Sequence, residues 1–286
     1  MFLDSEQRLR LPLRLLLYFV AYFVLVVALQ AVTEAIPAPM AARRLVFLVL
    51  VVPLLAGMTW VFRRWLDRRS WEGIGLSGPG AGLLLAGCLA GFGLVGLITL
   101  VEWSAGWRDV VGAWDPWLFL MSFAASLGVG FAEEVAFRGY FLANLGERLP
   151  LWLVALITGL VFGALHLQSA PAAWAPGVIT GCVVITFLFT AVRVGTGSLW
   201  AAIGLHWGWN WSQGHLYEAL QRSGPELMVG PAGFHEVGLV STGITLVATV
   251  LVAWGLRRQI RWSRAFSPGL QKTSVHSSSD RDGETT

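Results

Sequence analysis

The sequence has few charged residues and few cysteines. Asp, Glu, Lys and Arg make up 13% of its 286 residues, about half the share of a typical soluble domain. Lys272 is the only lysine, and the arginines cluster beside apolar runs without interleaved aromatics, so nucleic-acid binding is not indicated. Cys88 and Cys182 lie in apolar stretches with no Cys-x-x-Cys or Cys/His spacing. A disulfide framework and a cysteine zinc site are therefore not indicated, and both cysteines are expected to face lipid or the core as small side chains.

Apolar residues are abundant instead. Hydrophobic residues make up 56% of the chain and the mean hydropathy is +0.65, as expected where lipid is the solvent. A helix that crosses a hydrocarbon core of about 30 Å needs roughly 20 mostly apolar residues. The sequence therefore predicts an all-α, polytopic integral membrane protein of about eight transmembrane helices, in one domain at 1–266. The eight apolar runs are 15–32, 45–62, 82–101, 116–136, 151–167, 177–194, 198–214 and 238–256.

Arginines are gathered at one set of loops. Groups at 8–14, 63–69 and 257–264 flank the first, second and eighth runs, so the positive-inside rule places these loops and both termini in the cytoplasm. The first run is longer than the apolar part of a typical signal peptide, and we expect it to be a transmembrane helix. The preference for arginine over lysine suggests a GC-rich bacterial genome, and hence the inner (plasma) membrane. The polar tail at 267–286 is predicted to be disordered and cytoplasmic.

Three ionisable residues stand at the end of the fourth apolar run: Glu133, Glu134 and Arg138. An ionisable group in the middle of a bilayer costs about 2.5–3.5 kcal/mol on insertion scales, so each such residue needs an explanation. Glu134 and Arg138 are four residues apart and can pair along one helix face. Adjacent glutamates point about 100° apart, so Glu133 should face elsewhere and have a different task. A charge cluster at the cytoplasmic helix end is the simpler alternative.

Two later runs also carry polar residues. If the fourth and fifth runs form a hairpin that turns at 149–150, Glu133 and His166 lie equally far from the turn and can meet. His206 and Asn210 lie one turn apart on one face of the seventh run, near the middle of the membrane. Each histidine alone could be a hydrogen-bonded core residue or a polar contact between helices. Polar groups at about one depth on three helices favour a single site.

One carboxylate, two imidazoles and an amide allow two routes to hydrolysis. In the first, Glu133, His166 and His206 bind zinc and leave an open position for a water whose pKa falls to about 7. In the second, no metal is bound, and Glu133 is the general base for a water held with His166. His206 and Asn210 then donate hydrogen bonds to the developing oxyanion. The residues themselves leave both routes open.

These residues resemble the three motifs of the CPBP family, which contains the type II CAAX prenyl endopeptidases and bacteriocin-immunity proteins. The resemblance covers about 117–214 and implies an intramembrane endopeptidase with a polar cavity among its helices. Its substrate would be a membrane-bound peptide or protein, prenylated or not, and zinc is a possible cofactor. The motifs are Glu133-Glu134-x-x-x-Arg138, Phe162-x-x-x-His166 and His206-x-x-x-Asn210. By the resemblance Glu133, His166, His206 and Asn210 act on the scissile bond, and Glu134, Arg138 and Phe162 support them.

Two other functions are compatible with these features. A non-catalytic membrane scaffold or bacteriocin self-immunity factor would keep the fold and bind a partner. A proton-coupled transporter would use the buried Glu and His residues as a path, but no internal repeat of the kind common in transporters is visible. The endopeptidase is favoured, because a scaffold has no need of a costly buried carboxylate beside two imidazoles.

Overall fold

The computed structural model describes residues 4, 6, 8–78, 80–107, 109–110, 116–167, 172–213, 228–229 and 238–266. The predicted disordered tail at 267–286 lies outside the described residues. The main helices are α1 (Leu11–Glu34), α2 (Met40–Val61), α3 (Ala81–Ser104), α4 (Pro116–Glu134), α6 (Leu151–His166), α7 (Ala175–Thr196), α8 (Leu199–Trp211) and α10 (Leu239–Gly255). The shorter elements are the π-helices η1 (Phe62–Leu66) and η3 (Val135–Phe141), α5 (Leu142–Leu145), the 3-10 helices η2 (Trp71–Ile74) and η5 (Ala172–Trp174), and the antiparallel strands β1 (Asp109–Val110) and β2 (Met228–Val229).

Each predicted apolar run coincides with one main helix, which confirms the all-helical membrane fold. Among the described residues, five helical stretches are long and apolar enough to cross a membrane: Leu11–Glu34, Ala42–Leu66, Ala81–Ser104, Leu120–Leu145 and Ala175–Thr196. The helices α6 and α10 are apolar but shorter, with 16 and 17 residues, and α8 has 13. The exact count of eight crossings therefore stays a prediction.

The fourth run is longer than the sequence indicated. The apolar run ends at 136, but the helical stretch continues through η3 and α5 to Leu145. The simpler alternative, a charge cluster at a helix end, does not apply, because Glu134 is buried within the helical stretch and paired with Arg138, one turn further on. The charged residues therefore do not end the helix. The chain turns at 146–150, where the hairpin was predicted.

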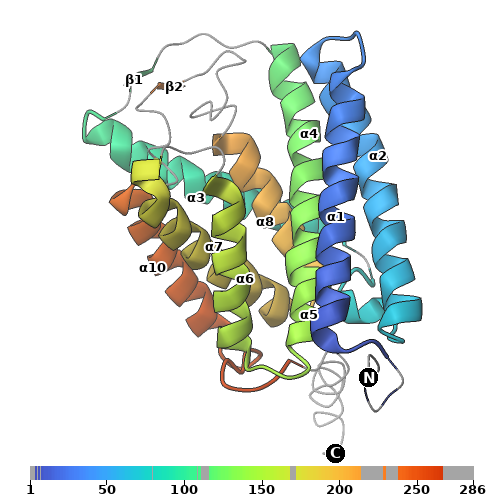
Figure 1. Cartoon of the computed structure of the whole chain (residues 1–286). Helices are drawn as coiled ribbons and strands as arrows, with labels where there is room; N and C mark the ends of the chain where they lie inside the picture. Colours follow the sequence, from blue (N-terminus) through green and yellow to red (C-terminus); the bar gives the residue numbers. More distant parts are fainter. Residues whose placement is uncertain are drawn as a thin grey trace, which may run out of the picture.

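Two groups of helices flank a central one. In Figure 1, α1, α2 and α4 stand together, and α3, α6, α7 and α10 form the other group. The short helix α8 packs against both α3 and α4, while α7 packs against α6 and α10. Every side chain from Ala201 to Trp209 is buried. The fold thus places the centre of α8, with its histidine, in the protein interior.

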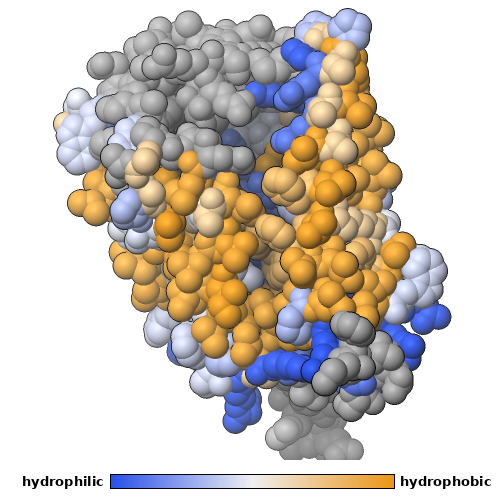
Figure 2. Space-filling model, viewed as in Figure 1, coloured by the Kyte–Doolittle hydropathy of each residue, from blue (hydrophilic) through white to orange (hydrophobic). Residues whose placement is uncertain are grey.

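The outer surface has the pattern of a bilayer-embedded protein. Figure 2 shows a broad apolar band over the middle of the molecule, with hydrophilic residues concentrated at the lower end. On this face the surface is hollowed between the two groups of helices, and hydrophilic residues are visible in the hollow. Large apolar side chains on the outer helices, such as Leu89 in α3 and Leu251 in α10, are exposed. An exposed apolar surface of this kind is favourable in contact with lipid.

Paired glycines let α3 and α8 approach closely. Gly87 and Gly91 in α3 lie against the backbone of α8, and Gly204 and Gly208 in α8 lie against the backbone of α3. A Cβ atom on Gly204 would overlap the carbonyl oxygen of Leu84. Small residues spaced by four are a common means of close helix contact in membranes. This contact fixes the position of α8 relative to the rest of the bundle.

The three arginine groups meet at one end of the molecule. Arg8 and Arg69 both bind Glu147, which lies in the turn after α5. The backbone N–H of Leu151 donates to the carbonyl of Arg264, which brings the third group to the same turn. The start of α1 lies at this end in Figure 1.

Candidate functional site

Glu134 is the most enclosed acid of the site. Its side chain is fully buried at the junction between α4 and η3. Its Oε1 atom accepts hydrogen bonds from Nη1 of Arg138 at 2.8 Å and from Nδ1 of His206 at 2.9 Å. The predicted i, i+4 pair is therefore present. Because two donors hold one of its oxygens in the interior, Glu134 is suited to orient its partners.

Glu133 is the accessible acid. Its side chain retains 21% of its solvent exposure, and its Oε2 atom lies 3.4 Å from Nε2 of His206. Glu133 was expected to face away from Glu134, but both side chains reach the same imidazole, one at each ring nitrogen. This part of the expectation was wrong, because a glutamate side chain is long enough to bridge the angular difference between neighbouring positions. A different task for Glu133 stays a prediction. His206 thus joins an accessible carboxylate to a buried one.

Arg138 is held by groups from two further helices. Its Nη2 atom donates to Oγ1 of Thr186 in α7 at 2.9 Å. Its guanidinium carbon lies 5.2 Å from the ring centre of Phe162 and 5.0 Å from that of Phe189. Cation–π contacts of this kind compensate part of the cost of burying the charge. The supporting role that the resemblance implied for Phe162 stays a prediction. Thr186 and Phe189 carried no signal in the sequence, since such residues are ordinary in an apolar helix.

His166 lies at the end of α6, beside Phe162. Its Nδ1 atom is 2.8 Å from the carbonyl oxygen of Phe162, and because a carbonyl can only accept, Nδ1 carries the hydrogen. In the neutral ring Nε2 is then the unprotonated nitrogen. The imidazole also packs against the Phe162 ring, with centroids 4.4 Å apart, and that ring is 6.2 Å from His206. Phe162 therefore connects the second and third motifs.

Helix α8 supplies the remaining predicted residue. Asn210 is partly buried and follows His206 by one helical turn. Between them, Trp207 donates from its indole nitrogen to the carbonyl of Phe123 in α4 at 2.6 Å, and the two rings pack together. On the other side of this contact, Gly130 of α4 lies against the Cβ atom of His206. These contacts hold the histidine beside the glutamates of α4.

The side chains around His206 do not form a metal site in their described arrangement. Within the described part of the chain, no three His, Cys, Asp or Glu side chains are grouped so that they could hold an ion. Both nitrogens of His206 face carboxylate oxygens, and Nδ1 of His166 is used by a carbonyl. As arranged, Glu133, His166 and His206 do not present the three converging donors of a catalytic zinc site.

The comparison with known families bears on the same segment. Residues 115–212 match an Rce1-like domain. The family is described as type II CAAX prenyl endopeptidase Rce1-like, and the match supports a membrane protein of protease type. The Rce1-like segment runs from α4 to the end of α8 and includes all three predicted motifs. No curated protein and no solved structure matches the chain. Helices α1 to α3 and α10 lie outside the Rce1-like segment.

Proposed function

We propose that the protein is an intramembrane endopeptidase that hydrolyses a peptide bond of a membrane-associated peptide or protein. The observation that carries this proposal is the contact of two glutamates with one imidazole. Glu134 is buried and has two hydrogen-bonded partners, while Glu133 is partly exposed on the other edge of the ring. The match to Rce1-like endopeptidases supports the same reaction class.

In the proposed reaction Glu133 is the general base. Its carboxylate removes a proton from a water molecule as the water oxygen attacks the carbonyl carbon of the scissile bond. The negative charge that develops on the carbonyl oxygen is stabilised by two hydrogen bonds. One is donated by a protonated ring nitrogen of His206 and the other by the side-chain amide of Asn210. Glu133 then gives the proton to the leaving nitrogen as the C–N bond breaks and the C=O bond re-forms, and a carboxylic acid and an amine are released.

The other residues act through these groups. Arg138 and Glu134 fix the orientation of His206, because the guanidinium and Nδ1 share the Oε1 atom of Glu134. His166 holds the attacking water through its Nε2 atom. Zinc bound by Glu133, His166 and His206 is the alternative route. It requires these side chains to converge beyond their described arrangement, so no step is assigned to it.

We further propose that the arginine-rich end faces the cytoplasm of a bacterium, with the chain in the plasma membrane. The proposal follows from the positive-inside rule, since the three arginine groups lie at the end where Glu147 binds two of them. A reporter that is active only in the cytoplasm can be fused to each terminus, and we expect it to be active at both. Activity of a second reporter, one that works only on the outer side of the membrane, would contradict this orientation.

The function is tested by cleavage of quenched fluorescent peptides that carry an apolar anchor, in vesicles that contain the purified protein. We expect wild type to cleave at least one peptide, and the isosteric substitution Glu133→Gln to lower kcat by about 10² to 10⁴-fold, as for loss of a general base. Glu34→Gln, which changes an exposed carboxylate at the far end of α1, is the matched control. Equal cleavage by Glu133→Gln and wild type would refute the assignment.

Metal content distinguishes the two routes and the non-catalytic alternative. The proposed route predicts activity without stoichiometric zinc, and full activity after treatment with a chelator. About one zinc per chain that is lost together with activity in His166→Ala would favour the metal route. A scaffold or immunity factor would cleave no peptide, and site variants would keep their protective effect in a bacteriocin challenge.

A further inference from the structure

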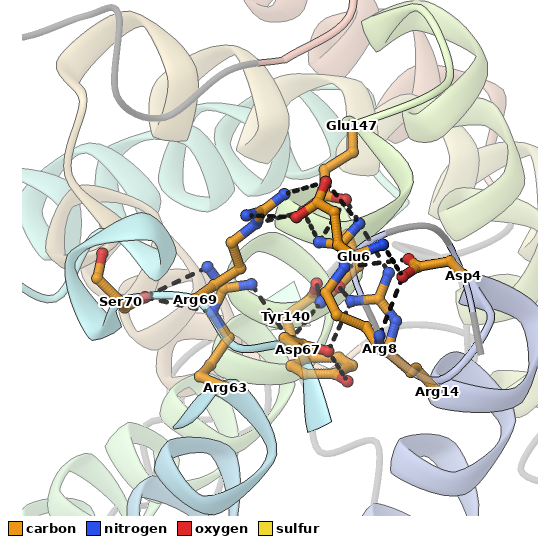
Figure 3. A network of polar contacts seen from close by, with 11 residues as sticks. Asp4, Glu6, Arg8, Arg14, Arg63, Asp67, Arg69, Ser70, Tyr140 and Glu147 are labelled. Atoms are coloured by element: carbon orange, nitrogen blue, oxygen red, sulfur yellow. Dashed lines mark hydrogen bonds and ion pairs between the residues drawn. The ribbon is translucent and has the colours of Figure 1, made fainter. Parts of the chain in front are cut away.

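A second buried polar cluster lies below the site, toward the arginine-rich end. Its centre is Asp67, the residue that follows η1, whose side chain is fully buried. Figure 3 shows Asp67 between Arg14, Arg63 and Tyr140. Around it, the carboxylates of Asp4, Glu6 and Glu147 bind the guanidinium groups of Arg8, Arg14 and Arg69. From the sequence alone, these arginines indicated only which side of the membrane their loops face.

All acceptor positions of Asp67 are occupied. Oδ1 accepts from Nη1 of Arg14 at 3.1 Å and from the hydroxyl of Tyr140 at 3.0 Å. Oδ2 accepts from Nη1 of Arg63 at 3.2 Å and from Nδ2 of Asn144 at 3.1 Å. Four donors match the roughly four lone-pair positions of a carboxylate. Two of them belong to the hairpin that carries the site, and the other two come from α1 and η1.

The π-helix η3 separates this cluster from the glutamates. Its N-terminal side is anchored at Glu134 by His206, and its C-terminal side is anchored at Tyr140 by Asp67. A π-helical turn contains one residue more than an α-helical turn, and one residue corresponds to about 100° of rotation. If η3 relaxed to an α-helix, the glutamates would rotate by about this angle relative to Tyr140. Both anchors can be satisfied together only while the π-helix persists.

We infer that Asp67 is a positioning residue, which through Tyr140 and Asn144 holds η3 in its π form and so aims Glu133 and Glu134 at His206. The inference rests on the proposed function. It assigns a role in the reaction to a residue outside the Rce1-like segment. Buried ion networks of this type are best attested as devices that fix register.

The test uses two tyrosines in one environment. Tyr18 and Tyr140 are both fully buried, and their rings stack 3.6 Å apart. The Tyr140 hydroxyl binds Asp67, whereas that of Tyr18 pairs with Thr59 at 2.8 Å. Tyr140→Phe removes one contact to Asp67 and keeps the stacked ring, and Tyr18→Phe is the matched control. Asp67→Asn is the stronger variant, because it places an amide opposite two donors.

We expect Tyr140→Phe to lower kcat about tenfold relative to Tyr18→Phe, with KM unchanged, because a hydrogen bond to a charged group is lost. We also expect faster amide hydrogen exchange at 135–141 in Tyr140→Phe only, measured by mass spectrometry. Equal kcat and equal exchange in the two variants would overturn the inference. If wild type cleaves no peptide, the proposed function fails, and the exchange comparison alone still decides whether Asp67 holds η3.

Discussion

Removal of the guanidinium of Arg138 tests the buried part of the site most directly. In Arg138→Met the side chain keeps an apolar stem that fits between Phe162 and Phe189, but Glu134 loses its shortest bond, at 2.8 Å. Breaking a buried ion pair by removing one partner costs about 3–5 kcal/mol, since the other charge stays buried. We expect a loss of this size in the free energy of unfolding, measured by equilibrium unfolding in mixed micelles.

A double-mutant cycle with Glu134→Gln separates the pair from its surroundings. In Glu134→Gln the buried carboxylate is replaced by a neutral amide, so removal of the guanidinium leaves no uncompensated charge. Arg138→Met should therefore lower the free energy of unfolding less in the Glu134→Gln background than in wild type. The expected coupling free energy is about 1.5–3 kcal/mol, the range for a hydrogen bond to a charged group. If the costs of the two single substitutions add without coupling, the pair does not stabilise the protein and the reasoning fails.

Three further predictions concern the surroundings of the site. Thr186→Val removes the second bond of the same guanidinium and should lower stability by about 1–3 kcal/mol; an unchanged melting temperature would contradict this. Gly204→Ala places a methyl group against the backbone of α3 and should reduce folded yield, whereas Gly93→Ala, with open space around it, should not. The backbone N–H of Arg8 lowers the pKa of Asp4 below 3.8. The ionised carboxylate of Asp4 therefore stabilises the folded protein above the ordinary pKa of the group, and this stabilisation is lost as the pH falls through the lower pKa of the folded state. Wild type should consequently lose more stability than Asp4→Asn in melting curves between pH 5 and pH 2, about the range in which a carboxyl titrates.

The positions of the helices could be predicted from the sequence because the apolar runs have the length that a bilayer requires. The arginine groups were also correctly expected at one end. The residue at which the fourth helical stretch ends was not predicted, because a charge pair inside a helix and a charge cluster at a helix end have the same local sequence. Only the partner on α8, 72 residues away, distinguishes them.

Predictions for the site differ in their outcome for a similar reason. The i, i+4 pair of Glu134 and Arg138 depends on local geometry and is present. Thr186 and Asp67 depend on which helices become neighbours, and a threonine in an apolar helix or an aspartate among arginines gives no sign of that. The π-helix η3 could not be predicted either, because the sequence was interpreted with the α-helical period of 3.6 residues per turn. Catalytic roles for Glu133, His166, His206 and Asn210 stay predictions until the variants are measured.

The two glutamates illustrate how neighbouring identical residues acquire different tasks. Their chemistry is the same, and so is their histidine partner, but Glu134 is enclosed by a guanidinium while Glu133 faces an accessible space. A buried carboxylate held by two donors is suited to orient other groups, whereas a partly exposed carboxylate can accept a proton from water. Exchange of the two tasks would require α4 to rotate by about 100°. The anchors at His206 and Asp67 oppose that rotation from both sides of η3. The fold therefore keeps Glu133 as the partly exposed carboxylate, as its proposed role as the base requires.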